Sequence, residues 1–500
     1  MSDTPERSFI EQARRDKLAA LLERGVPAFA YRFERTHTAD GAVQLWREGA
    51  EGPMVSLAGR IVALRDHGKS WFAHLADASG KIQLYFKKDV VGAEAFDILK
   101  LLDLGDHLGV HGPLMKTRTG EITVQVQAFE LLAKALRPLP LGKVTKGTDG
   151  TEERHSDFAD PELRYRQRYA DLAVHPERRE TFRQRAAIVR AVRRVLDERG
   201  FLEVETPILQ PLYGGASARP FTTHYNALDH AFYLRVADEL YLKRCIVGGI
   251  ERVYEIGKDF RNEGMDRSHN PEFTMLECYQ AYADYSDIME LTEALIRAAV
   301  QGATGATVVA GKHGPIELGD TFRRVGFVEL MREKAGVDLL EAQDAELAAA
   351  LKTRGVEPDT RLGRGRLMDQ LFGLCVEPYV IEPTFICDYP IEISPLAKPK
   401  RGEPRLAERF ELFIDGMEMA NAFSELNDPD DQRLRLEAQS ALKAAGDEEA
   451  QTLDEDYLRA IEYGMPPTGG LGLGIDRLTM LVTGKRSIRD VLLFPAMRPE

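Results

Sequence analysis

The chain has 500 residues, of which 44% are hydrophobic, and a formal net charge of −14. This length exceeds that of one ordinary domain, so we expect two or three domains. The acidic charge excludes a protein that coats nucleic acid along its whole surface, although a local basic face could still bind RNA. No apolar run is long enough for a membrane helix, and the opening segment MSDTPERSFIEQARRDK lacks the apolar stretch of a secretory signal. We therefore expect a cytoplasmic protein with no membrane partner.

The first predicted element is a helix over residues 8–24, where apolar side chains recur at helical spacing. Gly25 and Pro27 mark its end. We assign residues 1–50 to an N-terminal helical extension.

Five β-rich segments follow, with a helical stretch at 93–102 between the third and the fourth. They are VSLAGRIVAL, SWFAHLAD, KIQLYF, HLGVHGPLMKT and EITVQVQAFELL. This order of elements is that of an OB-fold, a small barrel that binds oligonucleotides. We therefore predict an OB-fold domain over residues 51–135, with another small β-barrel as the alternative.

Residues 136–160 are rich in proline, glycine and charge and have no apolar period, which indicates an interdomain linker. Beyond it a long helix is predicted over 175–200. Further helices, separated by strands, are predicted near 284–300, 325–375 and 431–462. Residues 161–500 are therefore expected to form a second, α+β domain with a helical insertion at about 325–375.

An unusually charged hairpin is predicted where FRNEGMDRSHNPEF joins two β-rich runs. If residues 253–262 form a strand, Arg261 and Glu263 lie on one face, because side chains two apart in a strand point the same way. The returning run would place Phe273, Glu277 and Tyr279 on a shared face. Unpaired buried charge is costly, so these side chains imply either a charged ligand or a salt-bridged sheet surface.

A second hairpin is predicted around Asp415 and Gly416, a strong two-residue turn signal. This turn pairs Glu411 with Ala420 and places Glu411 and Glu418 close enough to share a divalent cation. Their oxygen ligands suit Mg²⁺. Strict alternation would turn Asn421, Phe423 and Glu425 to the opposite face, so a bulge between Glu418 and Asn421 is required if they serve the same site.

The third feature is the glycine-rich strand in GGLGLGIDRLTMLVTG. Gly470, Gly472 and Gly474 alternate, which leaves one face bare for a ligand or for packing. Arg477 then lies at the start of a helix. The pattern is not a dinucleotide-binding G-x-G-x-x-G, because Arg477 occupies the last glycine position.

Together these three stretches resemble the signature motifs of class II aminoacyl-tRNA synthetases, with FLEVETP as the end of the first motif. The predicted barrel resembles that of the subgroup for lysine, aspartate and asparagine. Within that subgroup, YGGASARPF, ADELYLKR, RNEG with HNPEFTMLE, and NAFSELND are similar to the lysyl-tRNA synthetase pattern. The resemblance covers nearly the whole chain. It implies an α+β protein, with an N-terminal OB-fold β-barrel and a catalytic domain whose antiparallel sheet is flanked by helices.

The resemblance also implies a role for individual residues. The expected catalytic residues are Arg261, Glu263 and Arg477. ATP is expected to contact these three together with His269 and Phe273. The lysine pocket is expected to comprise Gly215, Glu239, Glu277, Tyr279, Asn421, Phe423 and Glu425. Mg²⁺ is expected at Glu411 and Glu418, and the anticodon at Phe72, Gln83 and Glu130.

The charge of the expected pocket suits its ligand, since lysine brings two ammonium groups and one carboxylate. The resemblance implies ATP-dependent attachment of L-lysine to tRNA(Lys) through a lysyl-adenylate, with release of AMP and pyrophosphate, by a homodimer. Two alternatives stay open: a non-catalytic synthetase-like protein, and a ligase that transfers lysine to a protein. Aspartyl or asparaginyl specificity would want cationic or amide groups where Glu277 and Glu425 stand.

Overall fold

The computed structural model describes residues 8–141, 143–146, 152–155, 158–358, 363–444, 446 and 449–499. The chain divides into two compact units, Met1–Arg178 and Arg179–Glu500. Small parts of the expected 1–50 extension, the 136–160 linker, the insertion near 325–375 and the last domain lie outside the described residues. The expected domain boundary at residue 161 differs from this division, because two short helices after it belong to the first unit.

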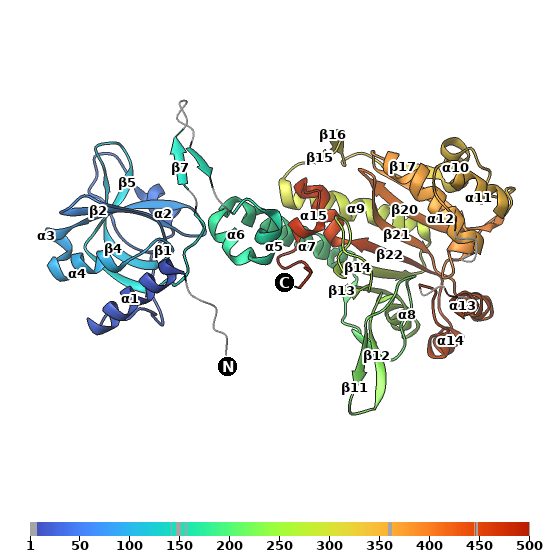
Figure 1. Cartoon of the computed structure of the whole chain (residues 1–500). Coiled ribbons are helices and arrows are strands. Elements are labelled where there is room, and N and C mark those ends of the chain that lie inside the picture. Colours follow the sequence, from blue (N-terminus) through green and yellow to red (C-terminus); the bar gives the residue numbers. More distant parts are fainter. Residues whose placement is uncertain are drawn as a thin grey trace. The chain divides into compact units, whose positions relative to one another are not determined.

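The first unit contains a β-barrel with short helices (Figure 1). Its helices are α1 (Phe9–Glu23), α2 (Ala39–Leu45), α3 (Lys88–Val91), α4 (Ala93–Ile98), α5 (Pro161–Arg166) and α6 (Arg168–Val174), with 3-10 turns at Leu99–Leu101 and Pro176–Arg178. Its strands are β1 (Met54–Asp66), β2 (Ser70–Ala76), β3 (Lys81–Lys87), β4 (His107–Lys116), β5 (Ile122–Val126), β6 (Ala128–Ala133), β7 (Lys143–Lys146) and β8 (Glu152–His155).

Five strands close the barrel in the order β1-β2-β3-β5-β4, and β4 pairs back onto β1. Every pair in this ring is antiparallel except β3–β5. Along β2 and β3 alternate side chains are buried, so each strand has one face in the barrel core. This confirms the predicted OB-fold. The last predicted segment divides into β5 and β6, and the segment interpreted as a linker includes the hairpin β7–β8.

The second unit is α+β (Figure 1). Its helices are α7 (Arg179–Glu198), α8 (Glu239–Val247), α9 (Tyr285–Thr304), α10 (Phe327–Ala335), α11 (Asp344–Lys352), α12 (Gly363–Cys375), α13 (Pro429–Ala444), α14 (Glu455–Glu462), α15 (Ile475–Thr483) and α16 (Ile488–Val491), with 3-10 turns at Glu377–Tyr379 and Ile391–Ile393. Its strands are β9 (Leu202–Glu203), β10 (Leu209–Gln210), β11 (Thr222–Tyr225), β12 (His230–Leu234), β13 (Arg252–Phe260), β14 (Glu272–Ala281), β15 (Val308–Gly311), β16 (Gly314–Glu317), β17 (Arg323–Gly326), β18 (Thr384–Pro390), β19 (Pro399–Lys400), β20 (Glu403–Ile414), β21 (Met417–Ser424) and β22 (Thr468–Gly474).

The main sheet has nine strands in the order β17-β18-β20-β21-β22-β14-β13-β9, with β19 beside β20. Its six central strands, β18-β20-β21-β22-β14-β13, are antiparallel to one another, as predicted. The outer pairs β17–β18 and β13–β9 are parallel, so the complete sheet is mixed.

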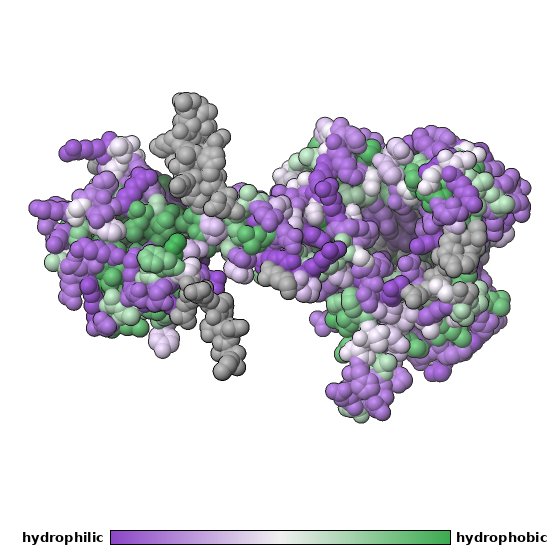
Figure 2. Space-filling view, in the orientation of Figure 1, coloured by the Kyte–Doolittle hydropathy of each residue, from purple (hydrophilic) through white to green (hydrophobic). Residues whose placement is uncertain are grey.

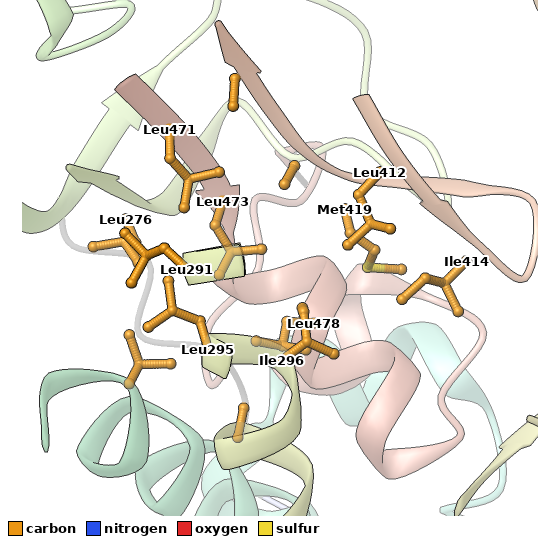
Figure 3. Packing of buried hydrophobic residues seen from close by; sticks show 14 of the residues in the cluster. Leu276, Leu291, Leu295, Ile296, Leu412, Ile414, Met419, Leu471, Leu473 and Leu478 are labelled. Carbon is orange, nitrogen blue, oxygen red and sulfur yellow. The ribbon is translucent and has the colours of Figure 1, made fainter. Parts of the chain in front are cut away.

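One face of this sheet packs on helices (Figure 3). Leu276 of β14 and Leu473 of β22 meet Leu291 and Leu295 of α9 in the core, and all four are buried. Since alternate strand residues point to opposite faces, this packing leaves the other face of β14, β21 and β22 for polar side chains.

Figure 2 shows a hollow in the surface of the second unit, with hydrophilic residues gathered around it. Among the described residues, no helix is long and apolar enough to cross a membrane.

Candidate functional site

A cavity of about 330 Å³ lies on the polar face of the sheet. Its walls come from β14, β21 and β22, from the start of α8 and α15, and from the loop between β13 and β14. The structure brings together in this cavity nearly all the candidate residues of the second unit, namely Gly215, Glu239, Arg261, Glu263, His269, Phe273, Glu277, Tyr279, Glu418, Asn421, Phe423, Glu425 and Arg477. Glu411 is the exception and does not line it.

Arg261 and Glu263 reach the cavity from a loop rather than from a strand. β13 ends at Phe260, so the predicted strand over 253–262 is too long and strand alternation does not place Glu263. The backbone N–H of Arg261 donates to the carbonyl of Pro271, 2.9 Å away, which closes the base of the loop. The two side chains do line one cavity, as predicted, but the loop after β13 places them there rather than strand alternation.

The bulge required by the second hairpin is present. Phe413 pairs with Glu418 and Leu412 with Ala420, so Met419 is the extra residue. Glu411 consequently pairs with Asn421, and the predicted pairing of Glu411 with Ala420 is wrong. Met419 and Ala420 are both buried in the hydrophobic core, and this changes the alternation so that Asn421 lies on the cavity side with Glu418.

The glycine strand makes room for the cavity wall. A Cβ atom on Gly470 would lie 1.9 Å from Oε1 of Glu425 and 2.5 Å from Cε1 of Tyr279. A Cβ atom on Gly472 would lie 3.2 Å from the end of the Met275 side chain and in ordinary contact, at 3.8 Å, with the carbonyl oxygen of Asn421. Gly470 is therefore required because the side chains of two neighbouring strands cross its bare face.

One end of the cavity is acidic. Glu239, Glu277 and Glu425 are all at least nine-tenths buried. The hydroxyl of Tyr279 donates to Oε2 of Glu277 at 2.9 Å. Lys243 ion-pairs with both Glu239 and Glu425. Burial is the main cause that raises the pKa of Glu425 well above its usual range, and Lys243 opposes it.

A cluster of buried carboxylates extends this acidic end. Asp238, Asp259 and Glu277 each place a carboxylate oxygen within 4.8 Å of the others, and in the described part of the chain they are the one group of three side chains that could hold a metal. Burial, reinforced by Asp259, raises the pKa of Asp238 to about 8. Burial also raises the pKa of Asp259 to about 6, although Arg235 opposes the shift. At neutral pH the cluster therefore holds protons.

The other end of the cavity carries arginine. The guanidinium carbon of Arg261 lies 5.0 Å from the centre of the Phe273 ring. Nη1 of Arg477 donates to Oε2 of Glu418 at 3.0 Å. In the loop, His269 Nδ1 lies 2.8 Å from a carboxylate oxygen of Asp266.

The expected metal ligands are each held by an arginine. Oε1 of Glu411 accepts from Arg409 at 2.5 Å, and Oε2 accepts from Tyr389 at 2.8 Å. Burial raises the pKa of Glu411 to about 7 against the effect of Arg409, and neighbouring Glu418 adds to the rise. Two neighbouring carboxylates that repel each other are a donor set that fits a hard divalent cation.

In the barrel, Phe72 and Gln83 lie on one outer surface. Phe72 of β2 pairs with Tyr85 of β3, with 4.8 Å between the ring centres, and His74 pairs with Gln83. Gln83 donates to Glu121 at 2.7 Å. This is the strand 2–3 surface with which OB-folds bind oligonucleotides. Glu130 is exposed on β6, which pairs with β4, so this pairing does not bring it to Phe72.

Several residues of the site were missed by sequence reasoning. They are Lys243, Asp238, Asp259, Arg409 and Tyr389. Two of them had a local signal, because Lys243 follows Glu239 by four residues and Arg409 precedes Glu411 by two. Asp238, Asp259 and Tyr389 lie beside partners far along the chain.

Two family models match the chain. The model for class II tRNA synthetases of the D, K and N type matches residues 160–498, and a model for OB-fold nucleic acid binding domains matches residues 55–132. The first match covers more than half of the chain, so it decides the family. The chain belongs to the class II tRNA synthetases.

Relatives of similar length support this assignment. A lysine–tRNA ligase from Carboxydothermus hydrogenoformans is 50% identical over 99% of both chains. One from Pelotomaculum thermopropionicum is 51% identical over 98% of this chain and 94% of its own length. One from Moorella thermoacetica is 50% identical over 97% of each chain. This class II synthetase therefore matches curated relatives from end to end.

Replacing Gly470 with alanine should destabilise this synthetase by roughly 1–3 kcal/mol, because Glu425 and Tyr279 must move to admit the methyl group. Urea unfolding of the purified protein measures the loss. Gly472→Ala is the matched control and should cost less, since the end of Met275 can turn aside. Equal losses for the two variants would show that Gly470 is not specially crowded.

The raised pKa of Asp238 should make the stability of the folded protein depend on pH. Its pKa rises on folding from 3.8 to about 8, so its contribution to stability is complete below about pH 4 and is lost as the pH rises towards 8. Asp238→Asn cannot ionise, so its melting temperature should exceed that of the wild type by more at pH 8.5 than at pH 5. The exposed Asp229→Asn is the control, with no such difference. A melting difference that is the same at both pH values would contradict the shift.

Proposed function

We propose that this synthetase attaches L-lysine to tRNA(Lys) with ATP, through a lysyl-adenylate, and releases AMP and pyrophosphate. The observation that carries the proposal is a single cavity with buried carboxylates at one end and arginines at the other. The acidic end matches the two ammonium groups of lysine, and the basic end matches a triphosphate. Aspartate or asparagine would bring an acidic or amide side chain to buried carboxylates, which is unfavourable.

At the acidic end, Glu239 binds the α-ammonium group while Tyr279 and Glu425 bind the ε-ammonium group. Gly215, Glu277, Asn421 and Phe423 complete this pocket, and all of them line the cavity. Gly215 has a φ of +89°, and a Cβ atom there would lie 3.1 Å from Cβ of Glu239. A larger residue at that position would therefore crowd the pocket.

At the basic end, Phe273 stacks on the adenine ring, and Arg261, Glu263, His269 and Arg477 contact the rest of ATP. Arg261 binds the α-phosphate, where negative charge develops in the reaction. Its guanidinium carbon lies 5.0 Å from the centre of the Phe273 ring, so the two side chains face the same end of the cavity.

Mg²⁺ would be held by Glu411 and Glu418, and when bound it supplies positive charge to the phosphates. The lysine carboxylate attacks the α-phosphorus, and pyrophosphate leaves. A carboxylate is already a nucleophile, so positioning and charge neutralisation carry this step without a general base. In the second step the terminal ribose hydroxyl of the tRNA takes the lysyl group, and AMP leaves.

The barrel would bind the anticodon. Phe72 stacks on a base, and Gln83 and Glu130 bond to base edges. We also propose that the enzyme works as a homodimer in the cytoplasm. The dimer proposal rests on the family resemblance around the helix before Pro207.

Exchange of pyrophosphate into ATP tests the proposal directly. Purified protein with Mg²⁺, ATP and labelled pyrophosphate should incorporate label with lysine and with none of the other nineteen amino acids above background. Charging of tRNA(Lys) transcripts is measured in parallel, since exchange alone does not need tRNA. Absence of lysine-dependent exchange would refute both a lysyl-adenylate and the charging reaction.

Glu425→Gln should weaken the binding of lysine more than the binding of ATP. Loss of the carboxylate removes an ionic partner of the ε-ammonium group, so the KM for lysine should rise by at least roughly tenfold. The KM for ATP should stay within about twofold, because ATP occupies the other end of the cavity. Exchange kinetics measure both constants, and similar losses for the two substrates would contradict the assigned role.

A further inference from the structure

Lys243 lies directly behind the acidic end of the cavity. It belongs to α8, one turn after Glu239, and its side chain is fully buried. Nζ donates to Oε1 of Glu239 at 2.6 Å and forms an ion pair with Oε2 of Glu425. Both glutamates line the cavity, whereas Lys243 does not.

The surroundings of this ammonium group are those of a lysine-binding site. Its Nζ lies 5.3 Å from the centre of the Phe423 ring and 6.0 Å from that of Tyr279. The two carboxylates and two rings that surround it also line the cavity. One wall therefore presents an internal ammonium group on one side and a space for a ligand on the other.

Among the described residues, Lys243 is the one cation within ion-pair distance of either Glu239 or Glu425. Burial by itself favours the neutral amine, but the two glutamates outweigh it and raise the pKa of Lys243 well above its usual range. Glu239 also raises the pKa of Glu425, because two neighbouring negative charges repel each other. Without Lys243 neither carboxylate would have a cation within ion-pair distance among the described residues.

We propose that Lys243 is a positioning residue for lysine specificity, an internal counter-ion that fixes the carboxylate oxygens of Glu239 and Glu425 at the cavity wall. It bridges one oxygen of each carboxylate and leaves the other oxygen of each for the substrate. This inference rests on the lysine pocket proposed above.

The test is lysine-dependent and ATP-dependent pyrophosphate exchange with Lys243→Met, a variant of similar volume and no charge. The KM for lysine should rise at least roughly tenfold, whereas the KM for ATP should change by less than about threefold. L-norleucine, which lacks the ε-ammonium group, serves as a competitor. Its inhibition constant should change by less than about threefold, so the preference for lysine over norleucine falls.

Lys134→Met is the matched control, because Lys134 is also fully buried and bridges two carboxylates, Asp103 and Asp106, but in the barrel. It should lower the melting temperature without changing either KM in exchange. If Lys243→Met does not fold, Lys243→Arg carries the test. It keeps the charge but displaces the two carboxylates, so the KM for lysine should rise at least roughly threefold above that of the wild type, while the KM for ATP changes by less than about twofold.

The outcomes separate the two proposals. Failure of the wild type to exchange with lysine refutes the pocket itself. If the wild type exchanges but folded Lys243→Met keeps its KM for lysine, the positioning role is wrong while the lysine pocket stands. The same holds if its affinities for lysine, norleucine and ATP all fall by the same factor.

Discussion

Burial of negative charge beside a ligand cavity is the constraint on which the site depends. Carboxylates removed from water destabilise a fold unless a cation or a hydrogen-bond donor compensates them. In this synthetase another element supplies the compensating cation for Glu418 and Glu425. Lys243 of α8 holds Glu425 at the end of β21, and Arg477 of α15 holds Glu418 of β21. These ion pairs therefore join helices to the sheet at the places where ligands would bind.

The sheet can carry such a site because one of its faces packs on helices and the other lines the cavity. Leucine side chains of β14 and β22 anchor one face on α9, which gives the strands a fixed position. The opposite face has the bare strand β22 at its centre, so long side chains from both neighbours cross it. Groups held in this way are preorganised, and preorganised charges stabilise a transition state at little cost of rearrangement.

The sequence predicted the elements well where a local pattern was strong. The alternation in β2 and β3 and the Asp415-Gly416 turn are properties of a few neighbouring residues, and both predictions are confirmed. Both turn residues have positive φ, as a two-residue hairpin of this kind needs. The extent of β13 was wrong, because nothing in the local pattern of FRNEG shows that pairing with β14 stops at Phe260.

The sequence by itself determined the order of the elements in the barrel and the two hairpins, since these follow from periodicity and turn chemistry. The residues expected in the cavity followed from the resemblance to class II synthetases. Only the tertiary structure decided that Met419 is the bulged residue, that Glu411 lies off the cavity, and that Lys243 bridges two glutamates. The physical reason is distance along the chain: Lys243 and Glu425 are brought into contact by the packing of α8 on the sheet. An ion pair that forms only through long-range packing leaves no local pattern in the sequence.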